Sequence, residues 1–61
     1  MNPDVFIAEV EKQRKLLEIS RSELAEVVGW SVRTQQRKFK DPGKITLDEA
    51  DRITSYLGIR G

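Results

Sequence analysis

Cysteine and histidine are both absent from this 61-residue chain. Without cysteine it forms no disulfide and has no thiolate nucleophile, and without histidine it lacks the usual general base and most zinc ligands. Asp48, Glu49 and Asp51 include neighbouring carboxylates, but two of them fall in the first turn of a predicted helix, where the helix dipole favours acids, and nothing else makes a catalytic set. We therefore expect no enzyme, no cofactor, no metal site and no small-molecule substrate.

Long hydrophobic runs are also missing. No apolar stretch approaches the roughly 20 residues of a membrane span, and the N-terminus lacks the basic-then-apolar order of a secretion signal. The chain has only four glycines, two prolines and four aromatic residues, with no repeat or low-complexity tract. We expect one cytosolic domain over residues 1–61, with a small core that buries about 60% of the unfolded surface.

Positive charge is unevenly distributed, although the formal net charge is only +1. Residues 31–44 carry five basic side chains and one acidic, whereas the remaining residues carry six basic and nine acidic. A solvated charged face explains most charge runs, so charge alone assigns no function. On a helix that follows a tight turn, however, the same polarity would orient the molecule on DNA.

The stretch 20–40 predicts two short helices joined by a glycine turn. Ser20 and Glu23 have the spacing of a capping box, which predicts that the first of these helices begins directly after Ser20. Gly29 can take the left-handed conformation that ends it. Ser31 is a second N-cap, and it predicts a helix from Val32 to about Lys40.

One face of that second helix is basic. Arg33, Gln36, Arg37 and Lys40 span an arc of roughly 100°, because successive residues are 100° apart around an α-helix. Major-groove reading requires such a face on a helix that follows a tight turn.

Two further helices are predicted on either side of this pair. Pro3 begins the first, with Asn2 as its cap, and the capping box of Thr46 and Glu49 begins the last, which runs over Leu47 to Leu57. Asp-Pro-Gly at 41–43 marks a turn between, and Gly58 followed by an apolar residue predicts a Schellman stop. The apolar stripe of the first helix is Phe6, Val10 and Leu17, widened by Val5, Ile7 and Leu16, and that of the last is Leu47, Ala50, Thr54 and Leu57, with Ile53 beside it.

Over about residues 12–59 the chain resembles the Cro and phage-repressor (XRE-like) type of helix-turn-helix regulators. The resemblance implies an all-α, lambda-repressor-like bundle of four or five short helices that contains a helix-turn-helix. The residues that carry it are Leu24, Ala25 and Val28 in the first motif helix, Gly29 and Trp30 in the turn, and Phe39 in the second.

The resemblance also implies which side chains contact DNA. The start of the second motif helix touches base edges in this family, and the residues around it contact phosphates. The implied base contacts are Ser31, Val32, Arg33, Gln36 and Arg37. The implied phosphate contacts are Ser20, Arg21, Thr34, Lys40 and Lys44.

Two residues depart from the family pattern. Gln35 and Lys38 occupy positions that are usually apolar, so either Gln35 is buried or the helix is rotated with Val32 and Phe39 inward. Val32 is then either a contact to a thymine methyl or part of the core. For Trp30, a place in the core is favoured over stacking on bases, and Lys38 is expected at the rim of the core.

The predicted function is a sequence-specific transcriptional regulator of double-stranded DNA, a Cro-like repressor from a phage or prophage, at the nucleoid in the bacterial cytosol. By resemblance it is a homodimer on a pseudo-palindromic operator, weak in free solution and completed on DNA, with contacts through the last helix and the Leu57 to Arg60 end. The alternative is a protein-binding module, such as an antirepressor, antitoxin or adaptor, that uses a helix face to bind a partner.

Overall fold

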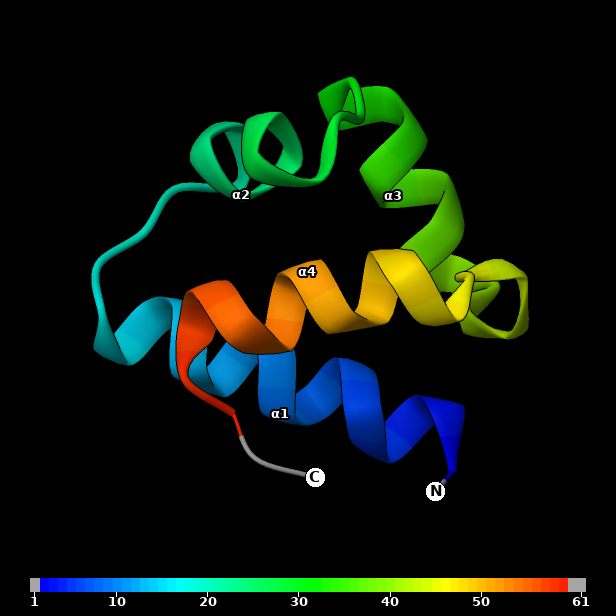
Figure 1. The fold of residues 1–61 in the computed structure, drawn as a ribbon, viewed down its shortest axis with the longest axis horizontal. Helices are drawn as coiled ribbons and strands as arrows, with labels where there is room; N and C mark the ends of the chain where they lie inside the picture. The colour runs from blue at the N-terminus through cyan, green and yellow to red at the C-terminus, as the bar shows by residue number, and fades with distance from the viewer. Residues whose placement is uncertain (1, 60–61) are drawn as a thin grey trace.

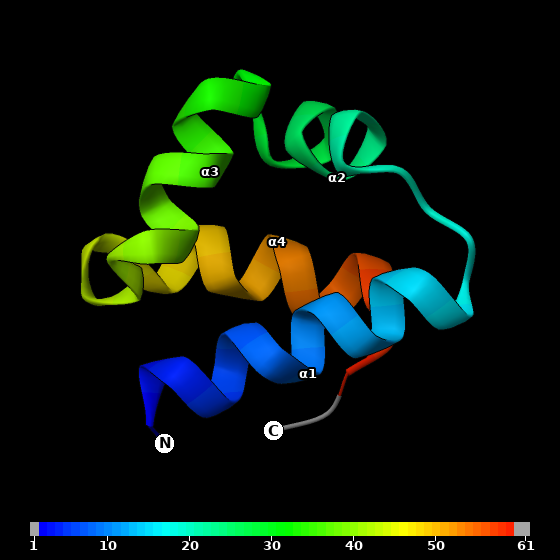
Figure 2. The same cartoon turned by 180° about the vertical axis from the view of Figure 1, so that it is seen from behind.

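The computed structural model of the chain describes residues 2–59, and within that range it is all-α, as predicted. In chain order the elements are α1 (Pro3–Leu16), α2 (Arg21–Val28), α3 (Val32–Lys40), the 3-10 turn η1 (Pro42–Lys44) and α4 (Leu47–Leu57). Helix α4 crosses the middle of the molecule, with α1 along one side and α2 and α3 on the other (Figures 1 and 2). No helix within residues 2–59 is both long and apolar enough to span a membrane.

The four predicted N-caps are confirmed, because each side-chain oxygen accepts a backbone N–H of the first turn; they are Asn2, Ser20, Ser31 and Thr46. The capping box at the start of α4 is complete. The box predicted at Ser20 is only half formed, because the carboxylate of Glu23 accepts a hydrogen bond from the Tyr56 hydroxyl of α4 instead of returning to its own helix start. Glu23 therefore connects α2 to α4.

Glycines end α2 and α4 as predicted, with Gly29 at φ 87° and Gly58 at φ 71°. After Gly58 the N–H of Ile59 donates to the carbonyl of Thr54 at 2.9 Å, which is the expected Schellman bond. These positive φ values are the reason that glycine is suited to both positions.

The end of α1 uses a different residue in the same conformation. Glu18 lies at φ 56°, and the N–H of Ile19 donates to the carbonyl of Arg14 at 3.0 Å, so the helix ends in a Schellman-like turn without glycine. A side chain in the left-handed region costs roughly 1–2 kcal/mol. The sequence carried no glycine signal here.

The core is formed by α1, α2 and α4. Its fully buried cluster is Val10, Leu24, Val28, Ile53 and Leu57, and no member of it comes from α3. Burying each such side chain contributes about 1.5–3 kcal/mol. Five half-buried hydrophobic residues pack against the cluster, namely Phe6, Ile19, Trp30, Phe39 and Ile59.

The predicted stripe of α1 is partly wrong. Leu17 is the C-cap residue and is 47% exposed. Leu16 and Val5 are also exposed, because they lie about 120° and 140° around the helix from the fully buried Val10. Arg14 is buried in their place. Its guanidinium donates to the Glu11 carboxylate at 2.6 Å and to the carbonyl of Ile19 at 2.9 Å, so its charge and two of its donors are satisfied.

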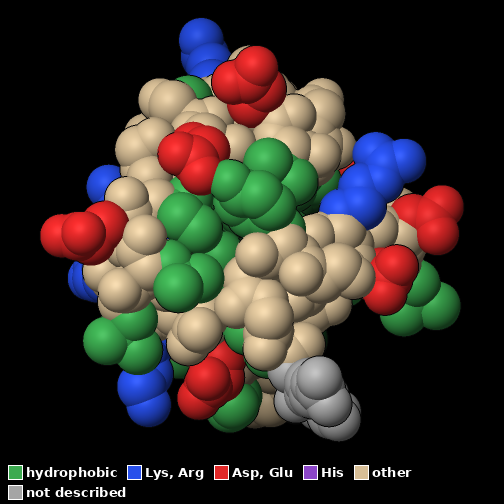
Figure 3. Space-filling model, turned by 60° about the vertical axis from the view of Figure 1, so that its left-hand side comes forward, with side chains coloured by type: hydrophobic (Ala, Val, Ile, Leu, Met, Phe, Trp, Pro, Cys, Tyr) green, Lys and Arg blue, Asp and Glu red, His purple; other side chains and the backbone are tan. Residues whose placement is uncertain are grey.

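The predicted stripe of α4 is corrected at both ends. Leu47 is 90% exposed, since it lies about 120° around the helix from the fully buried Ile53. Leu57 is buried inside the chain and so is not available for the dimer contact expected there, while Arg60 lies outside the described residues. Figure 3 shows hydrophobic side chains at the surface with acidic side chains around them.

Candidate functional site

The rotation of α3 decides which of its side chains face outward. Gln35 is 1% exposed, so the first of the two expected orientations is correct, and the alternative, a helix rotated to bring Val32 inward, is wrong. Arg33 and Arg37 lie about 160° around the helix from Gln35 on either side, and both are exposed. Because Gln35 points inward, Arg33 and Arg37 point toward solvent.

The outward side of α3 is the polar, positively charged surface that the sequence predicted. We call it the basic face and define it as Arg33, Gln36, Arg37 and Lys40, all of which are exposed. No acidic residue occurs within α3. The three cations therefore meet no opposing charge from their own helix.

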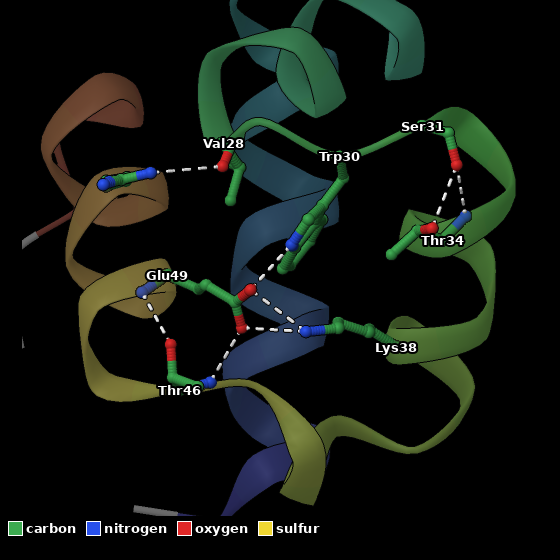
Figure 4. A network of polar contacts seen from close by, with 8 residues as sticks. Val28, Trp30, Ser31, Thr34, Lys38, Thr46 and Glu49 are labelled. Carbon is green, nitrogen blue, oxygen red and sulfur yellow. Dashed lines mark hydrogen bonds and ion pairs between the residues drawn. The ribbon is translucent and has the colours of Figure 1, made fainter.

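The start of α3 is rigidly capped. The Ser31 hydroxyl accepts the N–H of Thr34 at 3.1 Å and donates to the Thr34 hydroxyl oxygen at 2.9 Å (Figure 4). The proton of the Thr34 hydroxyl is therefore free to be donated to a ligand. Val32 keeps 37% of its surface exposed, so the interpretation of Val32 as a core residue is wrong.

An open hollow lies between the end of α3 and η1. The side chains that line it are Thr34, Arg37, Lys38, Lys40, Asp41 and Lys44. The only acidic member, Asp41, lies 3.7 Å from the ammonium of Lys44, and both side chains are largely exposed. Three of the residues that line this hollow, Thr34, Lys40 and Lys44, are predicted to contact phosphates. A fourth, Arg37, is predicted to contact a base.

A second, smaller hollow lies between α1, α2 and α3. It is lined by Glu11, Arg21, Gln35, Gln36, Phe39 and Lys40. Arg21 and Lys40 are thus close to Gln36 of the basic face, although the Arg21 guanidinium is 4.0 Å from Glu11, which offsets part of its charge. Ser20 is exposed, and its hydroxyl oxygen caps α2.

One carboxylate that sequence analysis assigned only to a helix cap joins three parts of the chain. Glu49 accepts the indole N–H of Trp30 at 2.8 Å, the ammonium of Lys38 at 3.0 and 3.1 Å, and the backbone N–H of Thr46 at 2.9 Å (Figure 4). These hydrogen bonds, led by the one from Thr46, lower the pKa of Glu49 from 4.5 to about 2. The carboxylate therefore stays ionised over the whole neutral range.

Trp30 and Lys38 have structural positions, as predicted. Trp30 packs against the core and meets Phe39 edge-on, with ring centroids 6.3 Å apart, and the Lys38 ammonium lies 5.1 Å from the indole centre. The sequence held only part of the signal for this network. A lysine on the inward side of a helix and an indole N–H both need an acceptor, but nothing in the sequence singled out Glu49, which was assigned to the cap of the last helix.

The exposed cations Arg37, Lys40 and Lys44 give the first hollow a positive charge that favours an anion. Residues 2–59 contain no cluster of three or more side chains that could hold a metal ion. Comparison with protein-family models, with curated proteins and with solved structures gave no match to this chain. The assignment of a function therefore rests on the residues of the chain itself.

Proposed function

We propose that this protein is a sequence-specific, double-stranded DNA-binding transcriptional regulator, in which α2, the turn at Gly29 and α3 form a helix-turn-helix of the lambda-repressor-like type. One observation carries the proposal. Gln35 is buried, and therefore Arg33 and Arg37 project from the opposite side of a short helix that follows a tight turn. A helix that presents base-reading side chains in this way is suited to the major groove.

Arg33 and Arg37 are the proposed base readers. A guanidinium donates two parallel hydrogen bonds to O6 and N7 of guanine, a pattern that no other base edge offers in the major groove. The two arginines are one helical turn apart, so both can enter one groove. Gln36 and the exposed Val32 extend the reading surface, the first toward adenine and the second toward a thymine methyl. Ser31 lies at the start of this reading surface.

Lys40 and Lys44 are the proposed phosphate anchors, with Thr34 as a hydroxyl donor in the same hollow. An ammonium is a point charge that binds any phosphate and distinguishes no base. Arg21 and the N-cap region at Ser20 supply contacts from α2. These residues position α3 but carry little sequence information.

Regulation is proposed to be steric. Two copies bind one face of a pseudo-palindromic operator and exclude polymerase or a competing regulator. Leu57 is buried, so the proposed contact between copies uses the outer surface of α4 instead, where Leu47 is 90% exposed. Such a contact is small, and we expect pairing to be completed on the operator. Sedimentation of free and operator-bound protein measures both states.

The binding test separates base reading from phosphate anchoring. An operator is first selected from random duplex DNA, and wild type, Arg33→Ala, Arg37→Ala and Lys44→Ala are titrated against it and against scrambled DNA at several salt concentrations. Each arginine variant should lose roughly 1–3 kcal/mol of discrimination at one base pair per half-site. Lys44→Ala should weaken binding to both DNAs alike and reduce the salt slope by about one unit.

Lys12→Ala is the matched control, because Lys12 is an exposed lysine on α1 that lines neither hollow. It should leave the discrimination unchanged. Equal losses on operator and scrambled DNA for all three test variants would mean that the arginines only clamp phosphates. No binding of wild type to mixed duplex DNA at low salt would reject the regulator and favour the protein-binding module.

A further inference from the structure

Hydrophobic packing holds α3 only weakly to the rest of the chain. None of the fully buried hydrophobic side chains comes from this helix, and its one fully buried residue is Gln35. Within residues 2–59 neither amide atom of Gln35 has a hydrogen-bond partner, and an unpaired buried polar group opposes burial. Phe39, half-buried against Trp30, is the main apolar contact that α3 makes.

Polar contacts to the Glu49 carboxylate provide the attachment of α3 that hydrophobic packing lacks. Lys38 on α3 and Trp30 in the turn before it both donate to Glu49 on α4, and the Lys38 and Glu49 side chains are 27% and 19% exposed. Figure 4 shows the three side chains converging between the two helices. Partial burial makes such a charge-assisted contact stronger than a surface ion pair.

From these contacts we infer that Glu49 is a positioning residue, and that the contacts of Trp30 and Lys38 to its carboxylate form a polar latch that fixes α3 against α4. When the latch is released, α3 loosens while the core of α1, α2 and α4 stays folded. The inference about α3 is independent of DNA. Only its consequence, that the latch sets the placement of the base-reading arginines, rests on the proposed function.

Lys38→Met tests the latch most directly, because it keeps the aliphatic stem and leaves the capping box of Thr46 and Glu49 whole. The measurement is native-state amide hydrogen exchange of the free protein. Amides in the second half of α3 should exchange about tenfold faster, whereas those of the buried residues Val10, Leu24 and Ile53 should keep their wild-type protection. Lys38→Arg, which retains the ion pair, should restore the protection of α3.

Three further variants separate the latch from other effects of the same region. Glu49→Gln removes the charge from the α4 side and should reproduce the loss of protection in α3. Thr46→Ala removes the hydroxyl that caps α4 but keeps the backbone N–H that donates to Glu49, so α3 should lose less protection than in Glu49→Gln. Asp51→Asn removes an exposed charge from α4 beyond its first turn and should change neither helix.

The inference is overturned if Lys38→Met speeds exchange equally in all helices, or if it changes none of them. A DNA-binding measurement then tests whether the latch sets the placement of the base-reading arginines. Lys38→Met should bind the selected operator about tenfold more weakly than wild type, because binding has to restore the docked helix. Failure of wild type to bind any duplex would reject the proposed function, yet the exchange result in free protein would still decide the latch.

Discussion

Replacing Gln35 tests the central packing feature of the molecule, the burial of an amide without partners. The side chain is 1% exposed, and both Oε1 and Nε2 lack a hydrogen-bond partner in the described part of the chain. Gln35→Met is the cleaner change, because methionine has nearly the same length, a similar helix propensity and no strong polar atom. Gln35→Val is the second variant, smaller and β-branched.

The expected gain in the free energy of unfolding is the cost of the unpaired amide minus the cost of any space that the new side chain leaves. An unpaired buried amide costs about 1–3 kcal/mol, and either substitution removes that cost. Valine also leaves a space that costs about 1 kcal/mol when the neighbours do not close it. The free energy of unfolding should therefore rise by about 1 kcal/mol for Gln35→Val and by about 1–2 kcal/mol for Gln35→Met.

Thermal melts followed by circular dichroism measure the effect. A gain of 1 kcal/mol raises the midpoint by roughly 4–8 °C in a domain of this size. Gln36→Met is the matched control, since Gln36 is the exposed neighbour on the same helix and its replacement should stay within about 0.5 kcal/mol of wild type. If both Gln35 variants melt at or below the wild-type midpoint, the buried amide is not a cost and the argument for weak packing under α3 is wrong.

Two other predictions concern the end of α1 and the pH dependence of stability. Glu18→Gly should raise the free energy of unfolding by about 1 kcal/mol, because glycine adopts the positive φ of this position without strain; a lower midpoint in urea titration would show that the Glu18 side chain outweighs it. The folded-state pKa of Glu49 is about 2, below its ordinary 4.5, so its contribution is complete above about pH 4.5 and is lost as pH falls toward 2. Wild type should therefore lose more stability than Glu49→Gln between pH 5 and pH 2 in parallel thermal melts, and equal losses would contradict the shift.

Local signals in the sequence were sufficient to predict the secondary structure. Short-range rules fix where these helices begin and end, because a serine, threonine or asparagine cap acts on backbone groups two or three residues away. Gly29 and Gly58 ended their helices for the same local reason. Glu18 shows the limit of this reasoning, since the conformation that ends α1 was imposed on a residue that does not prefer it.

The face that each helix buries was predicted less well. Periodicity places apolar residues on one side, but it does not say how far the neighbouring helix extends, and so Leu17 and Leu47 were assigned to the core although both are exposed. The same limit applies to Arg14. A charged side chain can be buried only where partners exist. Glu11 lies one turn earlier on α1, whereas the second partner, the Ile19 carbonyl, is placed there by the turn after α1.

By itself, the sequence determined the helices, the turn at Gly29 and the basic character of residues 31–44, because all three depend on neighbours along the chain. Only the tertiary structure decided the rotation of α3, and with it the side to which Arg33 and Arg37 project. The physical reason is that Gln35 and Lys38 carry no hydrophobic preference for the interior. Their orientation is set by the helices packed beneath them and by Glu49, eleven residues beyond Lys38 in the chain.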